Sequence, residues 1–496
     1  MKKRRRLTTL LLAGVVVGAA TLVLVSCRRA TDESSAPKTA SPDVVATIGE
    51  YSITQSELKQ RLAREVRPQR EDSGVPERSV TAESVLREMI AEKAMSMEGR
   101  ALGYLEDEAI ADQLEQARQR KLIQMLLTDY VREHIPVTPE EIDEQLKANP
   151  KLTPEQAAWR VQTPQAGPVL EQFYAGLLEK YGAEKVKENF AEVSRVHQRL
   201  LTQPAKPRGP NVYWIMNSQL RDDLSEAEKN LVLVKYEGGQ LTLKDWFDML
   251  CQMAPPGRPK NLNTTAGVEG LVDRALQPLI WVAEARERGY DQDEQFLQEM
   301  RKVEDIRLLG KVQSEKLKDI AKPTEDEIKA YFEAHQEWFG TSAAIRVDQV
   351  WCKDLQTAKE VRMRLDDGAS LESLKSTYSL TKNEQAHNTY PSSEGPFWGE
   401  LWKAEPNDVV GPVRGFHADG VKWRVVKIYE KTPTQMQPYS DSVKNGVESA
   451  IYTLRRREIL AACRAELLQK YPYEIYADSI KDIDPLEVTP AEEGNN

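Results

Sequence analysis

The side chains that most often carry out chemistry are few and scattered in this chain of 496 residues. Its five histidines include no pair at the spacing of metal ligands, and no cysteine stands beside them. Neither a G-x-x-x-x-G-K-[ST] phosphate loop nor a G-x-S-x-G nucleophile turn is present. The sequence therefore predicts no metal site, no phosphate loop and no serine-hydrolase site. The histidines are His134, His197, His335, His387 and His417.

Cys27 is the one cysteine whose neighbours indicate a reaction. A basic segment, Lys2 to Arg6, precedes the apolar run Leu7 to Val25, and Leu24-Val25-Ser26-Cys27 follows the pattern of a lipobox. Residues 1–26 are therefore typical of a bacterial lipoprotein signal peptide, cut before Cys27, whose lipidated thiol would hold the protein on a membrane. The alternative is an uncleaved transmembrane anchor, because the apolar run approaches the ~20 residues that cross a bilayer.

Either reading places the body of the protein outside the cytoplasm, in the periplasm if the cell has two membranes. Residues 27–43 are rich in Ser, Ala, Pro and charge, as in a flexible tether. The remaining cysteines, Cys251, Cys352 and Cys463, lie too far apart for a disulfide framework and are predicted to be free thiols.

Composition excludes two classes of protein. The net charge is −10, whereas a protein that tracks the phosphates of nucleic acid is usually basic. Beyond the N-terminal run no apolar stretch is long enough to cross a bilayer, which excludes channels and transporters. The length corresponds to roughly three or four domains at about 100–200 residues each.

An internal repeat organises the chain. Glu98-x-Arg100-x-x-Gly103-Tyr104 recurs as Glu284-x-Arg286-x-x-Gly289-Tyr290, an offset of 186 residues. The same offset carries Thr138 onto Thr324, Ala157 to Val161 onto Ala343 to Val347, and Gly209-Pro210 onto Gly395-Pro396. Several blocks at one spacing predict a tandem duplication.

The predicted fold is α+β and multidomain, with mostly helical halves alternating with α/β halves. In the second α/β half, Ile345 to Trp351 alternates as a strand, and Val409 to Val413 and Trp423 to Ile428 form the closing strands. The predicted domains are 44–150 and 232–338 (helical), 151–231 and 339–432 (α/β), 433–482 (a C-terminal helix and strand) and 483–496 (an acidic tail).

Short motifs along these elements point to a known family. They are Val45-Ala46-Thr47-Ile48, Ile53-Thr54, Glu57-Leu58, Tyr378-Ser379, Gly411-Pro412-Val413, Val425-Val426-Lys427 and Tyr471-Pro472-Tyr473-Glu474-Ile475. With these motifs the chain resembles SurA/PrsA-type parvulin (PpiC-like) peptidyl-prolyl isomerases and chaperones, including their lipoproteins. The resemblance implies that the N-terminal helical region and the C-terminal helix form a chaperone module, that unfolded or proline-containing polypeptides are the partners, and that no cofactor is used.

Isomerising a prolyl bond needs no covalent step, only a dry apolar pocket and polar groups that favour the twisted amide. In active parvulins two histidines and an Asp or Cys form the polar cluster. The resemblance places Gln349, Thr381 and Arg424 (or Lys422, depending on the gap in the alignment) at these three positions, so each has changed. It places Phe397, Trp398, Leu401 and Trp402 where the substrate-binding apolar residues lie.

Three functions remain open from the sequence. The preferred one is a membrane-anchored, extracytoplasmic folding factor that acts mainly as a chaperone for unfolded envelope or secreted proteins. The second is an active prolyl cis-trans isomerase, which requires Gln349, Thr381 and Arg424 to converge on one cleft. The third is a scaffold or assembly subunit of an envelope complex. The first α/β half, 151–231, is predicted to be a non-catalytic, degenerate parvulin-like domain.

Overall fold

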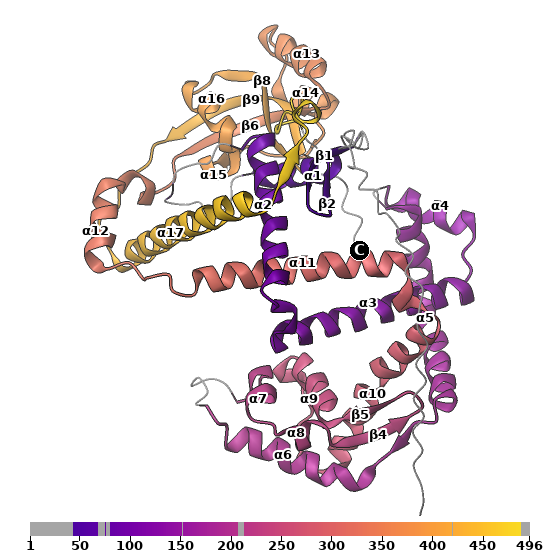
Figure 1. Cartoon of the computed structure of the whole chain (residues 1–496). Helices are drawn as coiled ribbons and strands as arrows, with labels where there is room; N and C mark the ends of the chain where they lie inside the picture. Colours follow the sequence, from indigo (N-terminus) through magenta and orange to yellow (C-terminus); the bar gives the residue numbers. More distant parts are fainter. Residues whose placement is uncertain are drawn as a thin grey trace, which may run out of the picture. The chain divides into compact units, whose positions relative to one another are not determined.

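The computed structural model describes residues 43–67, 75, 80–150, 152–206, 213–418 and 420–487, all within one compact unit (Figure 1). The predicted signal peptide, Cys27, the tether up to residue 42 and residues 488–496 lie outside the described residues. Long helices and three small sheets make the fold α+β, as predicted. Among the helices so described, none is long and apolar enough to span a membrane. Cys251, Cys352 and Cys463 are free thiols, as predicted.

The first module begins with a β-hairpin and two helices. Thr54 ends the hairpin and caps the following helix, because its hydroxyl accepts from the Glu57 amide while the Glu57 carboxylate accepts from the Thr54 amide. The core of the module contains Leu58, Leu62 and Leu86. These first elements of the module are β1 (Val44–Ile48), β2 (Tyr51–Thr54), α1 (Gln55–Glu65) and α2 (Ala82–Ala101).

After α2 the chain turns sharply and continues in two further helices. Gly103 adopts a left-handed conformation (φ 72°) that side chains disfavour, and Asp107 then caps the next helix. Thr138 and Glu141 form a capping box at the start of the last helix. These elements are η2 (Tyr104–Glu106), α3 (Glu108–His134) and α4 (Pro139–Ala148).

The second module repeats this order of elements. Gly289 again has a left-handed φ (80°), Asp293 caps the following helix, and Thr324 forms a capping box with Glu327. The elements are β4 (Val232–Tyr236), β5 (Gly239–Thr242), α9 (Leu243–Gln252), η4 (Pro255–Gly257), α10 (Thr265–Glu287), η5 (Tyr290–Gln292), α11 (Glu294–Leu317), α12 (Glu325–Ala334) and η6 (Gln336–Phe339).

Residues 151–231 differ from the prediction, since they form helices rather than an α/β domain. The predicted counterpart of the strand at 343–347 lies inside the 27-residue helix α5, whose buried positions Gln162, Ala166 and Phe173 recur at helical spacing. The likeness between 157–161 and 343–347, four identical residues of five, was therefore misleading about structure. The elements are α5 (Pro154–Lys180), β3 (Glu184–Lys185), η3 (Lys187–Asn189), α6 (Phe190–Thr202), α7 (Asn217–Asp222) and α8 (Glu226–Lys229).

The two modules are completed by exchanged segments. After α17 (Asp441–Lys470), strand β10 (Tyr473–Ile475) pairs with β1 of the first module, whereas β3, which follows α5, pairs with β4 of the second. Helix α17 packs on α2, and α5 packs on α10. The long helices of the two modules also pack on each other, since α2 packs on α11 and α10 packs on α3. Figure 1 shows α17 beside α2 and α11.

Matching ion clusters tie the exchanged segments down. Lys470 and Tyr471 both donate to the Glu98 carboxylate, at 2.5 and 2.7 Å. Lys180 and Tyr181 donate to Glu284, at 2.6 and 3.1 Å, and Glu284 is the repeat counterpart of Glu98. The packing of the C-terminal helix on the N-terminal region agrees with the implication of the resemblance; the duplication itself stays a prediction from the sequence.

A four-stranded sheet of order β7-β6-β9-β8 forms the remaining domain. Helices α13 and α14 contact one face, which buries Val350, Cys352 and Val425, and α16 covers Val347 and Val426 on the other face. The elements are β6 (Ala344–Cys352), α13 (Leu355–Asp366), α14 (Leu371–Tyr378), β7 (His387–Thr389), α15 (Pro391–Glu394), η7 (Gly395–Phe397), α16 (Trp398–Lys403), β8 (Val409–His417) and β9 (Gly420–Thr432); the chain ends in η8 (Ala477–Ser479) after β10.

His197 makes the stability of the second module depend on pH. Its ring stacks on Phe247, and Nδ1 is buried without a hydrogen-bond partner in the described part of the chain. Burial, aided by the charge of Arg258, lowers the pKa of His197 to about 4. At pH 5 the unfolded chain, with a histidine pKa of about 6.5, binds a proton that the folded chain does not, so stability falls as the pH falls.

We therefore expect His197 alone to remove about 2 kcal/mol of stability between pH 7 and pH 5. Urea unfolding at the two pH values should show this loss in the native chain, and the His197→Leu variant should lack it. An equal loss in both proteins would contradict the assignment.

Candidate functional site

The three sequence-predicted polar residues lie on or beside the central strands of the four-stranded sheet. Gln349 stands on β6 and Arg424 on β9, and the register pairs Trp351 with Arg424 and Gln349 with Val426. Because side chains alternate along a strand, Gln349, Trp351 and Arg424 share one face of the sheet. This is the face that α16 covers further along the strands.

Arg424 is the centre of a buried charge network. Only 1% of the residue is exposed, and its guanidinium donates to Gln349 Oε1 at 2.8 Å and forms an ion pair with both carboxylate oxygens of Glu394. The Thr389 hydroxyl donates to the same carboxylate at 2.5 Å, and the guanidinium lies over the Trp351 ring, 4.9 Å from its centroid. The cation is thus neutralised and held from several sides.

The network continues from Gln349 to a second ion pair. The Gln349 amide donates to Glu384 Oε1 at 2.9 Å, and buried Lys375 donates to Asp348 at 2.5 Å and to the Glu384 carbonyl. Two polar atoms of this region, Arg424 Nε and Glu384 Oε2, are buried with no partner among the described residues. The side-chain oxygen and nitrogen of Gln349 each have a partner within the protein, Arg424 and Glu384.

Thr381 does not join Gln349 and Arg424. Its hydroxyl lies 3.0 Å from His417 Nε2; Thr381 is exposed and His417 half-buried. The His417 ring meets the Trp351 ring edge-on at 5.2 Å, so Trp351 stands between His417 and buried Arg424. The structure thus brings together two of the three predicted positions and places the third with a histidine that the sequence comparison did not single out.

The predicted substrate-binding residues divide in the same way. Phe397 is nearly buried and meets the Phe416 ring edge-on at 5.1 Å. Trp398 and Trp402 stack at 5.2 Å and remain partly exposed, with Lys431 over Trp402. Leu401 is fully buried in the core beneath them, so its predicted contact with a substrate is not available.

Sequence reasoning missed the residues that hold Arg424, above all Glu394 and Trp351. One signal was present, because an arginine in the interior of a predicted core strand needs a buried carboxylate partner. Glu394, directly before Gly395-Pro396, was the candidate within the segment already singled out. Nothing in the described residues groups three or more potential metal ligands.

Gly415 on β8 leaves room for the Arg424 side chain. A Cβ added at Gly415 would overlap the guanidinium, which its ion pair prevents from moving aside. We expect Gly415→Ala to destabilise the domain by about 1–3 kcal/mol through overpacking. Gly399→Ala is the control, since a Cβ there meets nothing within 4 Å, and it should leave the unfolding midpoint unchanged or slightly raised. Equal midpoints in urea unfolding for both variants would contradict this packing.

Comparison with known proteins identifies the domain that carries this site. Residues 323–445 match the sequence model of the PPIC-type PPIASE domain. No curated protein matches the chain.

Several solved structures align with parts of this chain. A SurA-like chaperone of Campylobacter jejuni is 13% identical and aligns over 54% of this chain and 98% of its own, with a TM-score of 0.23. PrsA of Bacillus anthracis is 18% identical over 38% of this chain and 86% of its own (TM-score 0.21), and the foldase protein PrsA of Streptococcus pneumoniae is 16% identical over 38% and 72% (TM-score 0.24). TM-scores this low do not establish a common arrangement, so the assignment depends on the sequence match.

That match covers the whole four-stranded sheet together with its helices, and it confirms the parvulin resemblance drawn from the sequence. The chain thus contains a parvulin domain, of the PPIC-type peptidyl-prolyl isomerase family, over residues 323–445.

Proposed function

We propose that this protein is an extracytoplasmic folding factor that acts mainly as a chaperone for unfolded polypeptides, with a parvulin domain that no longer isomerises prolyl bonds efficiently. The observation that carries the proposal is the buried Arg424–Glu394 ion pair with Gln349. A prolyl isomerase needs polar groups that reach the substrate amide in a dry pocket. Here Gln349 and Glu394 are instead bonded to Arg424 beneath the surface.

The location is part of the same proposal. The lipobox-like Leu24 to Cys27 and the basic and apolar segments before it support a lipid anchor at Cys27 and a body outside the cytoplasm. A membrane-held chaperone would meet polypeptides as they emerge from translocation. Radiolabelled palmitate in growing cells should label the native chain and not a Cys27→Ala variant; equal labelling of both would exclude the anchor.

A second candidate is an active isomerase, which the Thr381–His417 pair favours. Thr381 is exposed and His417 half-buried, their side chains lie 3.0 Å apart, and half-buried Phe416 precedes His417 on β8. In this alternative His417 would supply the hydrogen bond that the buried residues cannot.

One experiment separates the two. The intact protein is tested for suppression of aggregation of an unfolded envelope protein and for isomerisation of a short Xaa-Pro peptide, beside Thr381→Ala and His417→Ala. We expect suppression near equal molar ratios in all three proteins and no acceleration of the peptide. Acceleration that both substitutions reduce would establish the isomerase, and failure to suppress aggregation would exclude the chaperone.

A further inference from the structure

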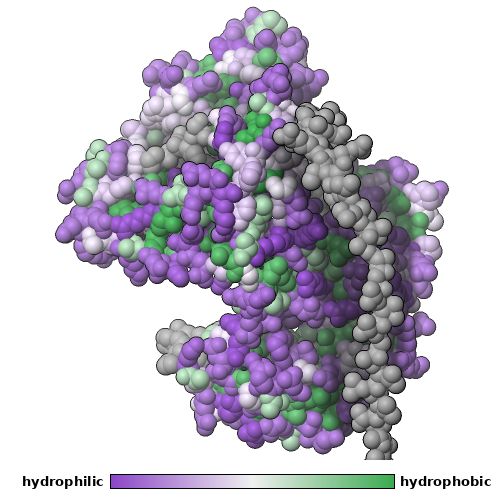
Figure 2. All heavy atoms as spheres, in the orientation of Figure 1, coloured by the Kyte–Doolittle hydropathy of each residue, from purple (hydrophilic) through white to green (hydrophobic). Residues whose placement is uncertain are grey.

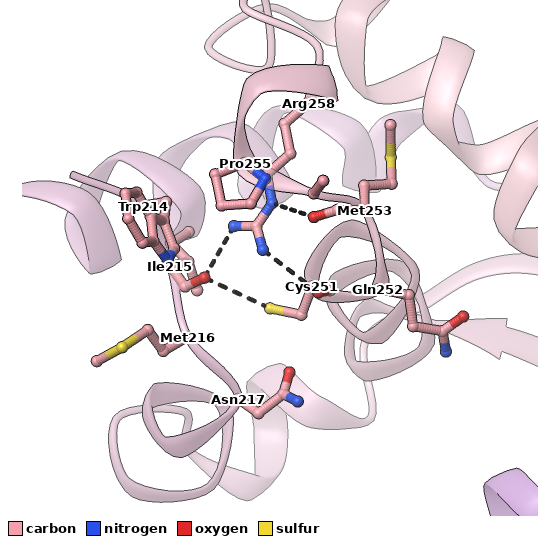
Figure 3. Close-up of a pocket in the computed structure, with 10 residues that line it drawn as sticks. Trp214, Ile215, Met216, Asn217, Cys251, Gln252, Met253, Pro255 and Arg258 are labelled. Carbon is pink, nitrogen blue, oxygen red and sulfur yellow. Dashed lines mark hydrogen bonds between the residues drawn. The ribbon is translucent and has the colours of Figure 1, made fainter. Parts of the chain in front are cut away.

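A pocket in the second half of the chain lies far in sequence from the parvulin domain. It has a volume of about 360 Å³ and opens between residues 214–217, before and at the start of α7, and residues 251–258, at the end of α9 and in η4 (Figure 3). Trp214, Met216, Met253 and Pro255 give it an apolar lining. Methionine side chains adapt to apolar groups of different shape, and tryptophan offers a large flat surface.

Among the described residues, Arg258 is the one charged residue that lines this pocket. Its guanidinium donates to the carbonyls of Ile215 at 2.8 Å and Met253 at 3.1 Å, and more weakly to Cys251. These bonds join the two walls (Figure 3) and leave two of the five N–H groups of the side chain. No carboxylate within the described ranges forms an ion pair with Arg258, so its charge is not neutralised and favours an anionic occupant.

Two amide side chains complete the pocket. Asn217 and Gln252 line it and are exposed, and neither side chain forms a hydrogen bond with any described residue (Figure 3). An amide group can donate to a peptide carbonyl and accept from a peptide N–H without selecting a side chain. The pocket therefore combines an apolar lining, an unneutralised cation and two groups able to bind peptide backbone.

We propose that this pocket binds an extended segment of an unfolded polypeptide that carries a large apolar side chain close to a carboxylate. The apolar side chain would lie against Trp214, Met216 and Met253, the carboxylate would meet Arg258, and Asn217 and Gln252 would bind the peptide groups between them. This inference rests on the proposed chaperone function and names a client-binding site within it.

The first measurement varies the ligand and leaves the protein native. Fluorescein-labelled Gly-Ser peptides carrying a central Phe-Ser-Glu, Phe-Ser-Gln, Phe-Ser-Lys or Ser-Ser-Glu are titrated by anisotropy with the full chain. We expect Phe-Ser-Glu to bind tightest, with the Lys and Ser-Ser peptides weaker by roughly tenfold each. Added salt should reduce the difference between Glu and Lys. Equal affinities for the Glu and Lys peptides would overturn the role of Arg258.

The second measurement varies the protein. Trp214→Ala should weaken the Phe-Ser-Glu peptide roughly tenfold, whereas Trp159→Ala, which removes a similarly exposed tryptophan from α5, should not change it. Asn217→Ala should weaken it severalfold. If Trp214→Ala binds the peptide as tightly as the native chain does, and the native chain still suppresses aggregation, the pocket is not the binding site. The proposed chaperone function would not be contradicted by that result. Loss of both peptide binding and suppression in the native chain would instead overturn the proposed function.

Discussion

Replacing Glu394 by glutamine will destabilise the parvulin domain by about 3–5 kcal/mol, although the substitution preserves the shape of the side chain. The reason is that Arg424 remains buried, at 1% exposure, after its carboxylate partner has lost its charge. An isolated buried cation cannot recover its hydration, and the other partners, Gln349 and the Trp351 ring, are uncharged. The expected loss is a large fraction of the stability of an ordinary domain.

Hydrogen–deuterium exchange followed by mass spectrometry would localise this effect. Peptides from β6 and β9 should exchange faster in Glu394→Gln, whereas peptides from the first and second modules should be unchanged. Glu400→Gln is the matched control, because Glu400 is exposed on α16 and should stay within about 0.5 kcal/mol of the native chain. A further variant, Arg424→Met with Glu394→Leu, should recover most of the lost stability, since apolar residues of similar volume often replace a buried ion pair without cost. Native exchange rates in Glu394→Gln would show that the pair is not buried.

Leu467→Ala is expected to destabilise the first module, some four hundred residues earlier in the chain, by about 2–5 kcal/mol. Leu467 lies on α17 and is buried in the same core as Leu58, Leu62 and Leu86. Removing its side chain leaves a cavity in that core, while α17 keeps its other contacts and its Lys470 and Tyr471 bonds to Glu98. Faster exchange should therefore appear in β1 and α2.

The reciprocal variant tests the exchange of segments directly. Leu177→Ala removes a buried side chain from α5, whose core includes Leu241, Phe247 and Leu271 of the second module. It should speed exchange in β4, β5 and α10 and leave β1 and α2 at native rates. If each substitution instead affected only the elements nearest to it in sequence, the exchanged packing would be wrong.

The residues of the candidate site were partly predictable. The alternation of Ile345 to Trp351 and the closing strands at 409–413 and 423–428 were sufficient to place Gln349 and Arg424 on neighbouring strands, which the structure confirms. They were not sufficient to find Glu394, His417 or the separation of Thr381, because these depend on how a loop and a hairpin end fold back over the sheet. Leu401 could not be distinguished from Trp398 and Trp402 by residue type, since all are apolar and only packing decides which is buried.

The sequence by itself determined the local structure. Thr54, Thr138 and Thr324 with an acid three residues later mark helix starts, and Gly103 and Gly289 mark sharp ends, because capping and left-handed turns depend on residues within a few positions. It also determined the helical character of 44–150 and 232–338. The prediction was wrong at 154–180, which forms a helix. The short match with the strand at 343–347 was given more weight than the helical spacing of the apolar residues.

Only the tertiary structure decided which segments pair. Strand β10 pairs with β1, and strand β3 pairs with β4. Each module is covered by a helix that comes after the other module in the chain, because α17 packs on α2 and α5 packs on α10. Two copies with similar apolar faces can each pack on their own helix and strand or on those of the other copy. The local sequence signals are nearly the same in the two cases. The choice depends on long-range burial and on the length and path of the intervening chain, including the domain around Arg424 that separates α12 from α17, and no local pattern records it.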